Sequence, residues 1–300
     1  AAQSTRSRLH VMTIAPLRQA AARRLILAVA ASCSLTLLSA FAVSSEAAET
    51  PTLAAAVAGP QRSDANRARD TYRHPEQTLQ FFGLTDRQTV IEIAPGAGWY
   101  TEILAPYLHA NGKLYEAPYI SADPKEADNE APYLARFRQK LAKDPADYGH
   151  VSVGSLNAGH LEGVGAPGTA DMVLTFRNIH NWIKDGYLDA NLRAFYAALK
   201  PGGVLGVEEH RAKPGTSLQQ TIDTGYVTED YVIEHARAAG FELAGRSEVN
   251  ANPRDTKNYA KGVWALPPTY ADGDHDKARY TAIGESDRMT LRFVKPATAH

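Results

Sequence analysis

The segment from Arg177 to Trp182, with the sequence Arg-Asn-Ile-His-Asn-Trp, gathers polar and aromatic side chains directly after an apolar run. His180 carries an imidazole, whose ordinary pKa lies close to neutral pH, so it is a candidate general base. Asn178 and Asn181 are candidate hydrogen-bond donors to a substrate, and Trp182 is a candidate pocket wall. The alternative is that the amides and the imidazole satisfy loop backbone groups while Trp182 belongs to the core.

A second polar segment, Glu208-Glu209-His210-Arg211, follows the apolar residues 204–207. Side chains alternate along a strand, so one of Glu209 and His210 is expected to face inward. Ligands of open α/β sheets bind at the carboxyl ends of the strands, so this segment and His180 are expected to share a crevice. Glu209 is therefore a second candidate catalytic residue, with a solvated glutamate at a strand end as the alternative.

A glycine turn lies in the stretch from Val90 to Leu104, VIEIAPGAGWYTEIL. The stretch predicts a buried strand, a turn over residues 94–98 and an amphipathic helix. Glycine allows a sharp turn and a close approach of the backbone to a ligand, and the start of a helix presents free N–H groups. This arrangement favours a crevice for a nucleotide-like ligand.

The rest of the chain predicts the elements that position these segments. Helices are expected to begin at Pro75 and after Gly98, and to span residues 131–142, 188–199 and 229–240. Strands are expected at residues 89–93, 113–117, 150–153, 171–176, 204–208, 241–249 and 288–294. The alternation predicts an α/β fold, Rossmann-like and doubly wound, whose mostly parallel seven-stranded sheet carries residues 288–294 as an antiparallel edge strand.

Residues 1–48 have the order of a secretory signal peptide. Arg18, Arg23 and Arg24 precede the apolar run Leu25–Val43, and small residues follow up to an expected cleavage site near Ala48. Cleavage predicts a periplasmic or secreted protein. The alternative is an uncleaved N-terminal membrane anchor, because the run approaches the ~20 residues that span a bilayer.

Composition limits the remaining possibilities. Residues 49–62 are expected to be a linker and residues 63–300 the folded domain, and the net charge of −1 argues against a nucleic-acid partner. The only cysteine, Cys33, lies in the N-terminal segment, so a mature chain has no disulfide and no cysteine zinc site. A small-molecule substrate is expected, the oligomeric state stays open, and no metal is expected. The alternative, a metal held together by His74, His180 and His210, rests only on three histidines scattered along the sequence, which is weak evidence.

Three ordered motifs resemble those of the class I S-adenosylmethionine (SAM)-dependent methyltransferases. Glu92–Gly98 resembles the acidic-x-Gly-x-Gly-x-Gly first motif, residues 171–176 resemble the fourth strand, and Leu199–Gly203 resembles the Leu-Lys-Pro-Gly-Gly turn before the fifth strand. The resemblance covers roughly residues 75–295. Further segments look like a secreted bacterial subgroup of predicted methyltransferases, namely 177–182, 207–211, 262–268 and 285–296.

The resemblance implies a set of cofactor contacts. Ala94 stands where the family has its first glycine, and Pro118 stands where the family has the acid that holds the ribose, with Glu116 two residues earlier as a substitute. Ser155 is expected near the adenine, and Tyr100 near the turn. The full set expected on this basis is Glu92, Ala94, Gly96, Gly98, Tyr100, Glu116, Ser155 and Arg177.

The function implied by the resemblance is transfer of a methyl group from SAM to a small-molecule or envelope acceptor. Two alternatives stay open. The exported fold has lost SAM and acts as a periplasmic binding module, or it is a hydrolase or lyase that uses His180 and Glu209.

Overall fold

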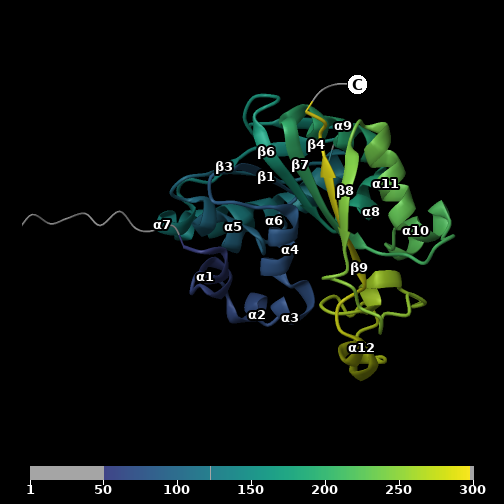
Figure 1. Cartoon of the computed structure of the whole chain (residues 1–300). Helices are drawn as coiled ribbons and strands as arrows, with labels where there is room; N and C mark the ends of the chain where they lie inside the picture. Colours follow the sequence, from purple (N-terminus) through teal and green to yellow (C-terminus); the bar gives the residue numbers. More distant parts are fainter. Residues whose placement is uncertain (1–50, 122, 298–300) are drawn as a thin grey trace, which may run out of the picture. The chain divides into compact units, whose positions relative to one another are not determined.

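The computed structural model describes residues 51–121 and 123–297 (Figure 1). The predicted signal segment at 1–48, with Cys33, lies outside the described residues. Across the described ranges, no helix combines the length and the apolar composition needed to cross a membrane.

Seven strands form one sheet in the order β3-β2-β1-β6-β7-β9-β8 (Figure 1). Strand β1 is parallel to β2 and β6, β2 is parallel to β3, and β6 is parallel to β7. Within the described part of this sheet, β9 alone runs in the opposite direction, antiparallel to its neighbours β7 and β8. The predicted Rossmann-like, mostly parallel seven-stranded sheet is therefore confirmed. The strands are β1 (Thr89–Ile93), β2 (Lys113–Ala117), β3 (Ser152–Val153), β6 (Ala170–Phe176), β7 (Leu199–His210), β8 (Glu242–Ser247) and β9 (Arg288–Val294).

The sheet has the expected antiparallel edge, because its edge strand β8 pairs antiparallel with β9. Residues 288–294, however, are not the edge strand. Strand β9 lies between β7 and β8, and β8 forms the edge. The first four residues of β9 are buried, whereas β8 alternates between exposed and half-buried residues. The alternating pattern of residues 288–294 suggested an edge strand, but Arg288 is 1% exposed and forms a buried ion pair with Glu208.

The order of the strands reverses beside β1. The chain runs from β1 outward to β2 and β3 and then returns to β6 on the other side of β1. At such a reversal the loops that follow the two central strands diverge and leave a crevice for a ligand. The predicted glycine turn follows β1, and the segment from Arg177 follows β6, so both lie at this point.

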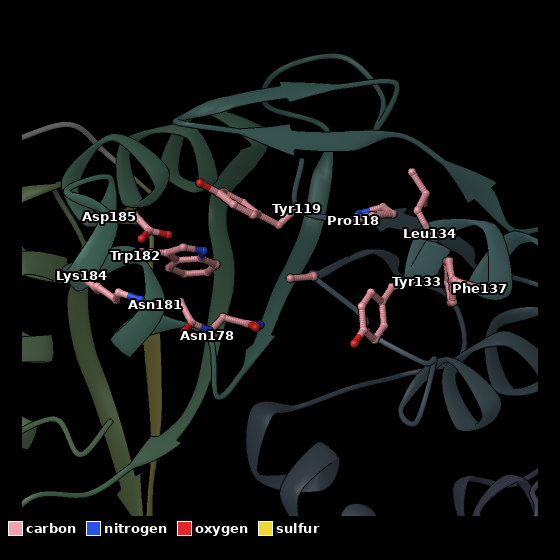
Figure 2. Close-up of a pocket in the computed structure, with 12 residues that line it drawn as sticks. Pro118, Tyr119, Tyr133, Leu134, Phe137, Asn178, Asn181, Trp182, Lys184 and Asp185 are labelled. Atoms are coloured by element: carbon pink, nitrogen blue, oxygen red, sulfur yellow. The ribbon is translucent and has the colours of Figure 1, made fainter. Parts of the chain in front are cut away.

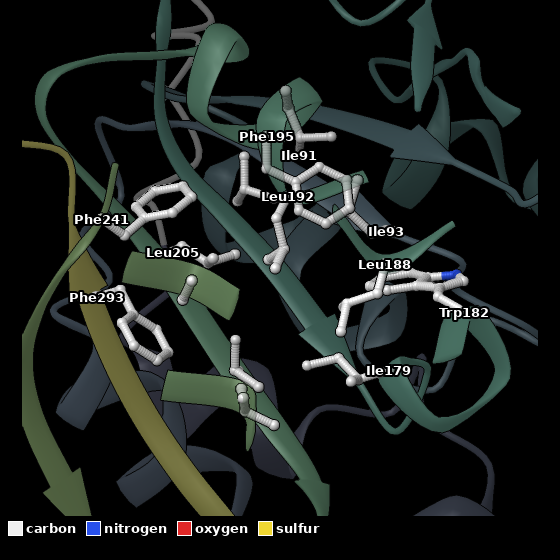
Figure 3. Close-up of a cluster of buried hydrophobic side chains, with 14 of the residues drawn as sticks. Ile91, Ile93, Ile179, Trp182, Leu188, Leu192, Phe195, Leu205, Phe241 and Phe293 are labelled. Atoms are coloured by element: carbon white, nitrogen blue, oxygen red, sulfur yellow. The ribbon is translucent and has the colours of Figure 1, made fainter. Parts of the chain in front are cut away.

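Two apolar clusters cover the two faces of the sheet. Ile91 and Ile93 face the cluster that contains α8 (Ile179–Asp185), α9 (Leu188–Ala198) and α11 (Glu229–Ala238) (Figure 3). Val90, on the opposite face because side chains alternate, packs with α4 (Pro75–Phe82) and α5 (Thr101–Leu108). These two layers hold the ends of β1 and β6 in fixed positions.

A third apolar cluster supports the long connection between β8 and β9. It joins Tyr226 to Tyr259, Leu266 and Tyr280, with η1 (Gly262–Ala265) and α12 (Lys277–Ile283). The connection is thereby packed rather than loose. The remaining elements are α1 (Leu53–Ala58), α2 (Asp64–Arg67), α3 (Asp70–Arg73), α6 (Pro124–Lys143), α7 (Pro145–Tyr148), α10 (Leu218–Thr224), and the small sheet of β4 (Ser155–Asn157) and β5 (His160–Glu162).

Residues 51–62 belong to the domain and do not form the expected linker. Helix α1 buries Leu53 in the cluster around α5. Arg62 is 1% exposed, and its two terminal nitrogens donate to the carboxylate of Asp70 at 2.6 and 2.7 Å. The alanine-rich composition suggested a linker, but this buried ion pair and the packing of α1 fix the segment on the domain.

Candidate functional site

A crevice of about 500 Å³ lies beside the carboxyl ends of β1, β2 and β6. We call it the glycine crevice. Helix α6 supplies one wall with Tyr133, Leu134 and Phe137, and the start of α8 supplies the opposite wall with Asn178 and Trp182 (Figure 2). Apolar walls with a few polar groups are typical of sites for small molecules. The other lining residues are Ala94, Gly96, Pro118, Tyr119, Asn181, Lys184 and Asp185.

The glycine turn has left-handed backbone at three positions. Ala94, Gly96 and Gly98 have φ angles of +49°, +59° and +78°. A Cβ atom on Gly96 would meet nothing within 4 Å, so the crevice is open there, whereas one on Gly98 would lie 3.0 Å from the ring of Phe137. Ala94 therefore adopts a left-handed conformation that glycine takes more readily, at a strain of roughly 1–2 kcal/mol. Strained backbone of this kind concentrates at ligand sites.

Helix α6 braces the turn through Lys140. Its Nζ donates to the carbonyls of Ala97 and Gly98 at 3.0 and 3.1 Å, and it pairs with Glu102 of α5 at 2.5 Å. The turn is thus tied to both α5 and α6, the two helices that flank it.

Two carboxyls lie buried beside the turn without lining the crevice. Glu92 of β1 is opposite Glu116 of β2 in the parallel pairing, and the Oγ1 of Thr101 donates to Glu92 at 2.8 Å. Burial raises the pKa of Glu92 to about 7. Burial and the charge of Glu92 together raise the pKa of Glu116 well above its ordinary value. Both carboxyls therefore favour the protonated form. Glu116, expected as a substitute for the ribose acid, is fully buried and does not line the crevice.

The other expected cofactor contacts lie elsewhere. Tyr100 is 1% exposed, stacks on Phe176 with ring centres 3.6 Å apart, and donates to Glu208 at 3.2 Å. Ser155 begins β4 and is not among the residues that line the crevice. Arg177 lines a second cavity instead. Of the expected cofactor residues, Ala94 and Gly96 alone line the glycine crevice.

Sequence reasoning missed the wall formed by α6. Tyr133, Leu134 and Phe137 were assigned to a surface helix because charged residues surround them. Their spacing places them on one face of the helix, and this was the signal that could have found them. Tyr133 is 67% exposed, which is unusual for an aromatic residue and is explained by its place at the crevice.

A second cavity of about 270 Å³ lies on the other side of the 177–182 segment. We call it the arginine cavity. Arg177 and His180 line it, while Asn178 and Asn181 line the glycine crevice. Arg177 precedes helix α8 and has left-handed backbone, with a φ angle of +61°. Asn178 also donates from its side chain to the carbonyl of Ile93 at 3.2 Å, which joins the ends of β1 and β6. The remaining lining residues are Arg69, Arg73, His210, Val263, Trp264, Pro267, Pro268, Thr269, Glu285 and Ser286.

The structure brings the two candidate catalytic residues His180 and Glu209 together. The Nδ1 of His180 lies 3.0 Å from Oε1 of Glu209, whose side chain is 0% exposed. The backbone N–H groups of His180 and His210 also donate to this carboxylate, at 3.3 and 2.8 Å. A carboxylate in this position favours the tautomer with a proton on Nδ1, which leaves Nε2 as the basic nitrogen.

His210 lies beside this pair and is held neutral. Its Nδ1 is 2.6 Å from the hydroxyl of Ser286. Burial, followed by the charges of His180, Arg177, Arg288 and Arg73, lowers the pKa of His210 well below its ordinary value.

His180, Glu209 and His210 each offer a metal ligand atom, and these atoms lie within 4.8 Å of one another. His74 is not part of this group, because its Nδ1 lies 3.4 Å from Asn250. The positive charges that lower the pKa of His210 also oppose a divalent cation at this place.

No protein-family model matches the chain, and no curated protein matches it. Among solved structures, a SAM-dependent methyltransferase from Aquifex aeolicus is 16% identical with a TM-score of 0.50, over 76% of this chain and 93% of that one. The cyclase SpnF is 17% identical with a TM-score of 0.53, over 82% of this chain and 92% of that one. A methyltransferase and a cyclase share the fold, so the reaction has to be argued from the site. The chain has the Rossmann-like fold of the class I SAM-dependent methyltransferases.

Proposed function

We propose that this protein is a SAM-dependent methyltransferase that acts on a small-molecule or envelope acceptor. One observation carries the proposal: the short segment 177–182 lines two cavities at once. The glycine crevice has apolar walls and a glycine turn, and the arginine cavity is polar and contains a histidine–carboxylate pair. A cofactor in the first and an acceptor in the second would meet at one segment.

The residues of the glycine crevice fit SAM. A volume of about 500 Å³ is in the range of cofactor sites. The backbone at Gly96 is left-handed and open, so a ligand can approach it closely. Phe137 and Trp182 supply apolar surface for an adenine ring, and Asn181 and Asp185 supply polar groups for the amino acid and the ribose hydroxyls. Strand β2 ends in Ala117 with Pro118 next, so the usual ribose acid is replaced from another element.

SAM, when bound, supplies a methyl group on a positively charged sulfur, so the protein has to align an acceptor and accept its proton. His180 is placed to accept the proton at Nε2, on the side of the arginine cavity. Glu209 holds the opposite nitrogen and stabilises the imidazolium that forms. His210, held neutral, adds no charge that would oppose protonation of His180.

Titration calorimetry with SAM and S-adenosylhomocysteine tests the proposal, with a matched pair of variants. Gly96 and Gly186 both have left-handed backbone, and a Cβ on either would meet nothing within 4 Å, but Gly96 alone of the two lines the crevice. Gly96→Ala and Gly186→Ala should therefore lose similar stability, roughly 1–2 kcal/mol. Binding should weaken at least about tenfold in Gly96→Ala and stay unchanged in Gly186→Ala. Absence of binding by the folded wild-type protein would sink the proposal.

We further propose that residues 1–48 direct export, with residues 49–300 acting outside the cytoplasm. The basic, apolar and small-residue order of the segment supports this. SAM is made in the cytosol, so export of the folded protein with bound cofactor is the route compatible with both proposals, and Arg23-Arg24 weakly resembles the signal for that route. A reporter fused to residues 12–50 should be exported folded; export by the general secretory route alone would contradict this.

A further inference from the structure

The arginine cavity contains three guanidinium groups that the protein only partly engages. Arg69 and Arg73 donate from Nε to the two oxygens of Glu285, at 2.6 and 3.0 Å. Arg177 donates from Nη1 to Glu208 at 2.7 Å. Each guanidinium thus uses one nitrogen, and within the described part of the chain the others have no hydrogen-bond partner.

Arg73 is the most informative of the three. Its side chain is only 5% exposed, yet both of its terminal nitrogens lack a hydrogen-bond partner among the described residues. Its guanidinium lies 4.7 Å from the centre of the Trp99 ring, which holds it in place. Because Arg73 lines the cavity, its unused terminal nitrogens are open to it, and a nearly buried guanidinium with such nitrogens points to a ligand that accepts hydrogen bonds.

The charges around the cavity leave a positive excess. Four guanidiniums, those of Arg69, Arg73, Arg177 and Arg288, face only the carboxylates of Glu208 and Glu285, with Glu209 farther along beside His180. Burial and the charge of the neighbouring Arg177 lower the pKa of Arg73 to about 9. The effect of Arg177 agrees with an excess of positive charge around the cavity. A bound anion would offset it, whereas a metal cation would increase it.

The other end of the cavity suits the reacting part of a small molecule. Trp264 and Pro267 supply apolar surface, and His180 supplies a basic nitrogen. Arg177 and His180 line the same small cavity, so a ligand that the arginines hold and that also reaches His180 would be short. The volume of about 270 Å³ admits a small molecule but not a folded partner.

We propose that the acceptor carries an oxyanion, a carboxylate or a phosphate, which Arg69, Arg73 and Arg177 bind while His180 faces the atom to be methylated. The identification of this ligand as the acceptor rests on the proposed function. The anion site itself stands on the guanidinium geometry. Arginine suits this role because its planar fork matches both kinds of oxyanion.

Titration calorimetry with inorganic phosphate and with acetate, at matched ionic strength, tests the anion site on the full chain. The wild-type protein should bind at least one probe, and the tighter probe identifies the acceptor group. Arg69→Gln and Arg73→Lys should weaken binding at least about tenfold, because each removes charge-assisted hydrogen bonds. Arg193→Gln, at an exposed position outside both cavities, should bind as the wild type does.

Three outcomes would overturn the anion site: no binding of either probe by the wild type, equal binding by all variants, or binding that requires added Zn²⁺. Thermal denaturation of each variant shows whether it is folded, and the conservative Arg73→Lys variant keeps the test valid if Arg69→Gln is unstable. SAM titrated into the same proteins separates the two proposals. SAM binding without anion binding would refute the anion site alone, and anion binding without SAM binding would refute the methyltransferase alone.

Discussion

The buried pair Glu92 and Glu116 makes the stability of the fold depend on pH in a direction that can be measured. Both carboxyls favour the protonated form in the folded state, because burial raises the pKa of each. A raised folded-state pKa contributes stability that is fully present below the unfolded value and is lost as pH rises through the folded value. For Glu92, this window extends from 4.5 to about 7.

The size of the effect follows from the shift. Each pKa unit corresponds to about 1.4 kcal/mol, so Glu92 alone loses on the order of 2–3 kcal/mol across its window. Glu116, with a pKa raised further, adds to this loss. His210 acts in the opposite sense, since its lowered pKa contributes stability that is lost as pH falls below 6.5. Glu285, with a pKa of about 2, acts below this window.

Because opposing groups titrate in the same range, a variant has to isolate the pair. Glu116→Gln preserves the shape of the side chain and removes one of the two titrating carboxyls. Its free energy of unfolding, relative to the wild type, should rise by at least about 2 kcal/mol between about pH 5 and about pH 8. Urea denaturation followed by circular dichroism gives this difference, with the exposed Glu162→Gln as the control. A difference that stays constant across the range would refute the reasoning.

Two further predictions concern the turn and the histidine. Ala94→Gly should raise the free energy of unfolding by about 0.5–1 kcal/mol, because glycine adopts the left-handed conformation at +49° without strain. Urea denaturation measures this free energy, and a variant less stable than the wild type would contradict the prediction. In the wild type the neutral form of His180 should carry its proton on Nδ1, and Glu209→Gln should yield a mixture of tautomers. Nitrogen NMR shifts distinguish the two states, and a wild-type proton on Nε2 would contradict the assignment.

Local patterns predicted much of the fold. The strands expected at 89–93 and 113–117 match β1 and β2 at both ends, and the glycine turn follows β1 as expected. The sequence alone placed the segment 177–182 and Glu209 at one crevice, because both were expected at the carboxyl ends of strands, which meet at one edge of a parallel sheet. In the structure, the Nδ1 of His180 lies 3.0 Å from Oε1 of Glu209.

The arginine cavity could not be predicted in the same way. Arg69 and Arg73 meet Glu285 across more than two hundred residues of chain, and no periodicity relates these segments. Tyr100 was expected near the cofactor because it follows the turn, but its ring turns into the core against Phe176. Position in a motif fixes the backbone of these residues, while the direction of each side chain depends on packing that the sequence does not display.

The crystal structure of the protein with S-adenosylhomocysteine tests the central claim most directly. We predict that the ligand lies in the glycine crevice, against the backbone of Gly96 and between Phe137 and Trp182, with its sulfur near the 177–182 segment. Ligand bound elsewhere, or a crevice that stays empty at a saturating concentration, would contradict the claim.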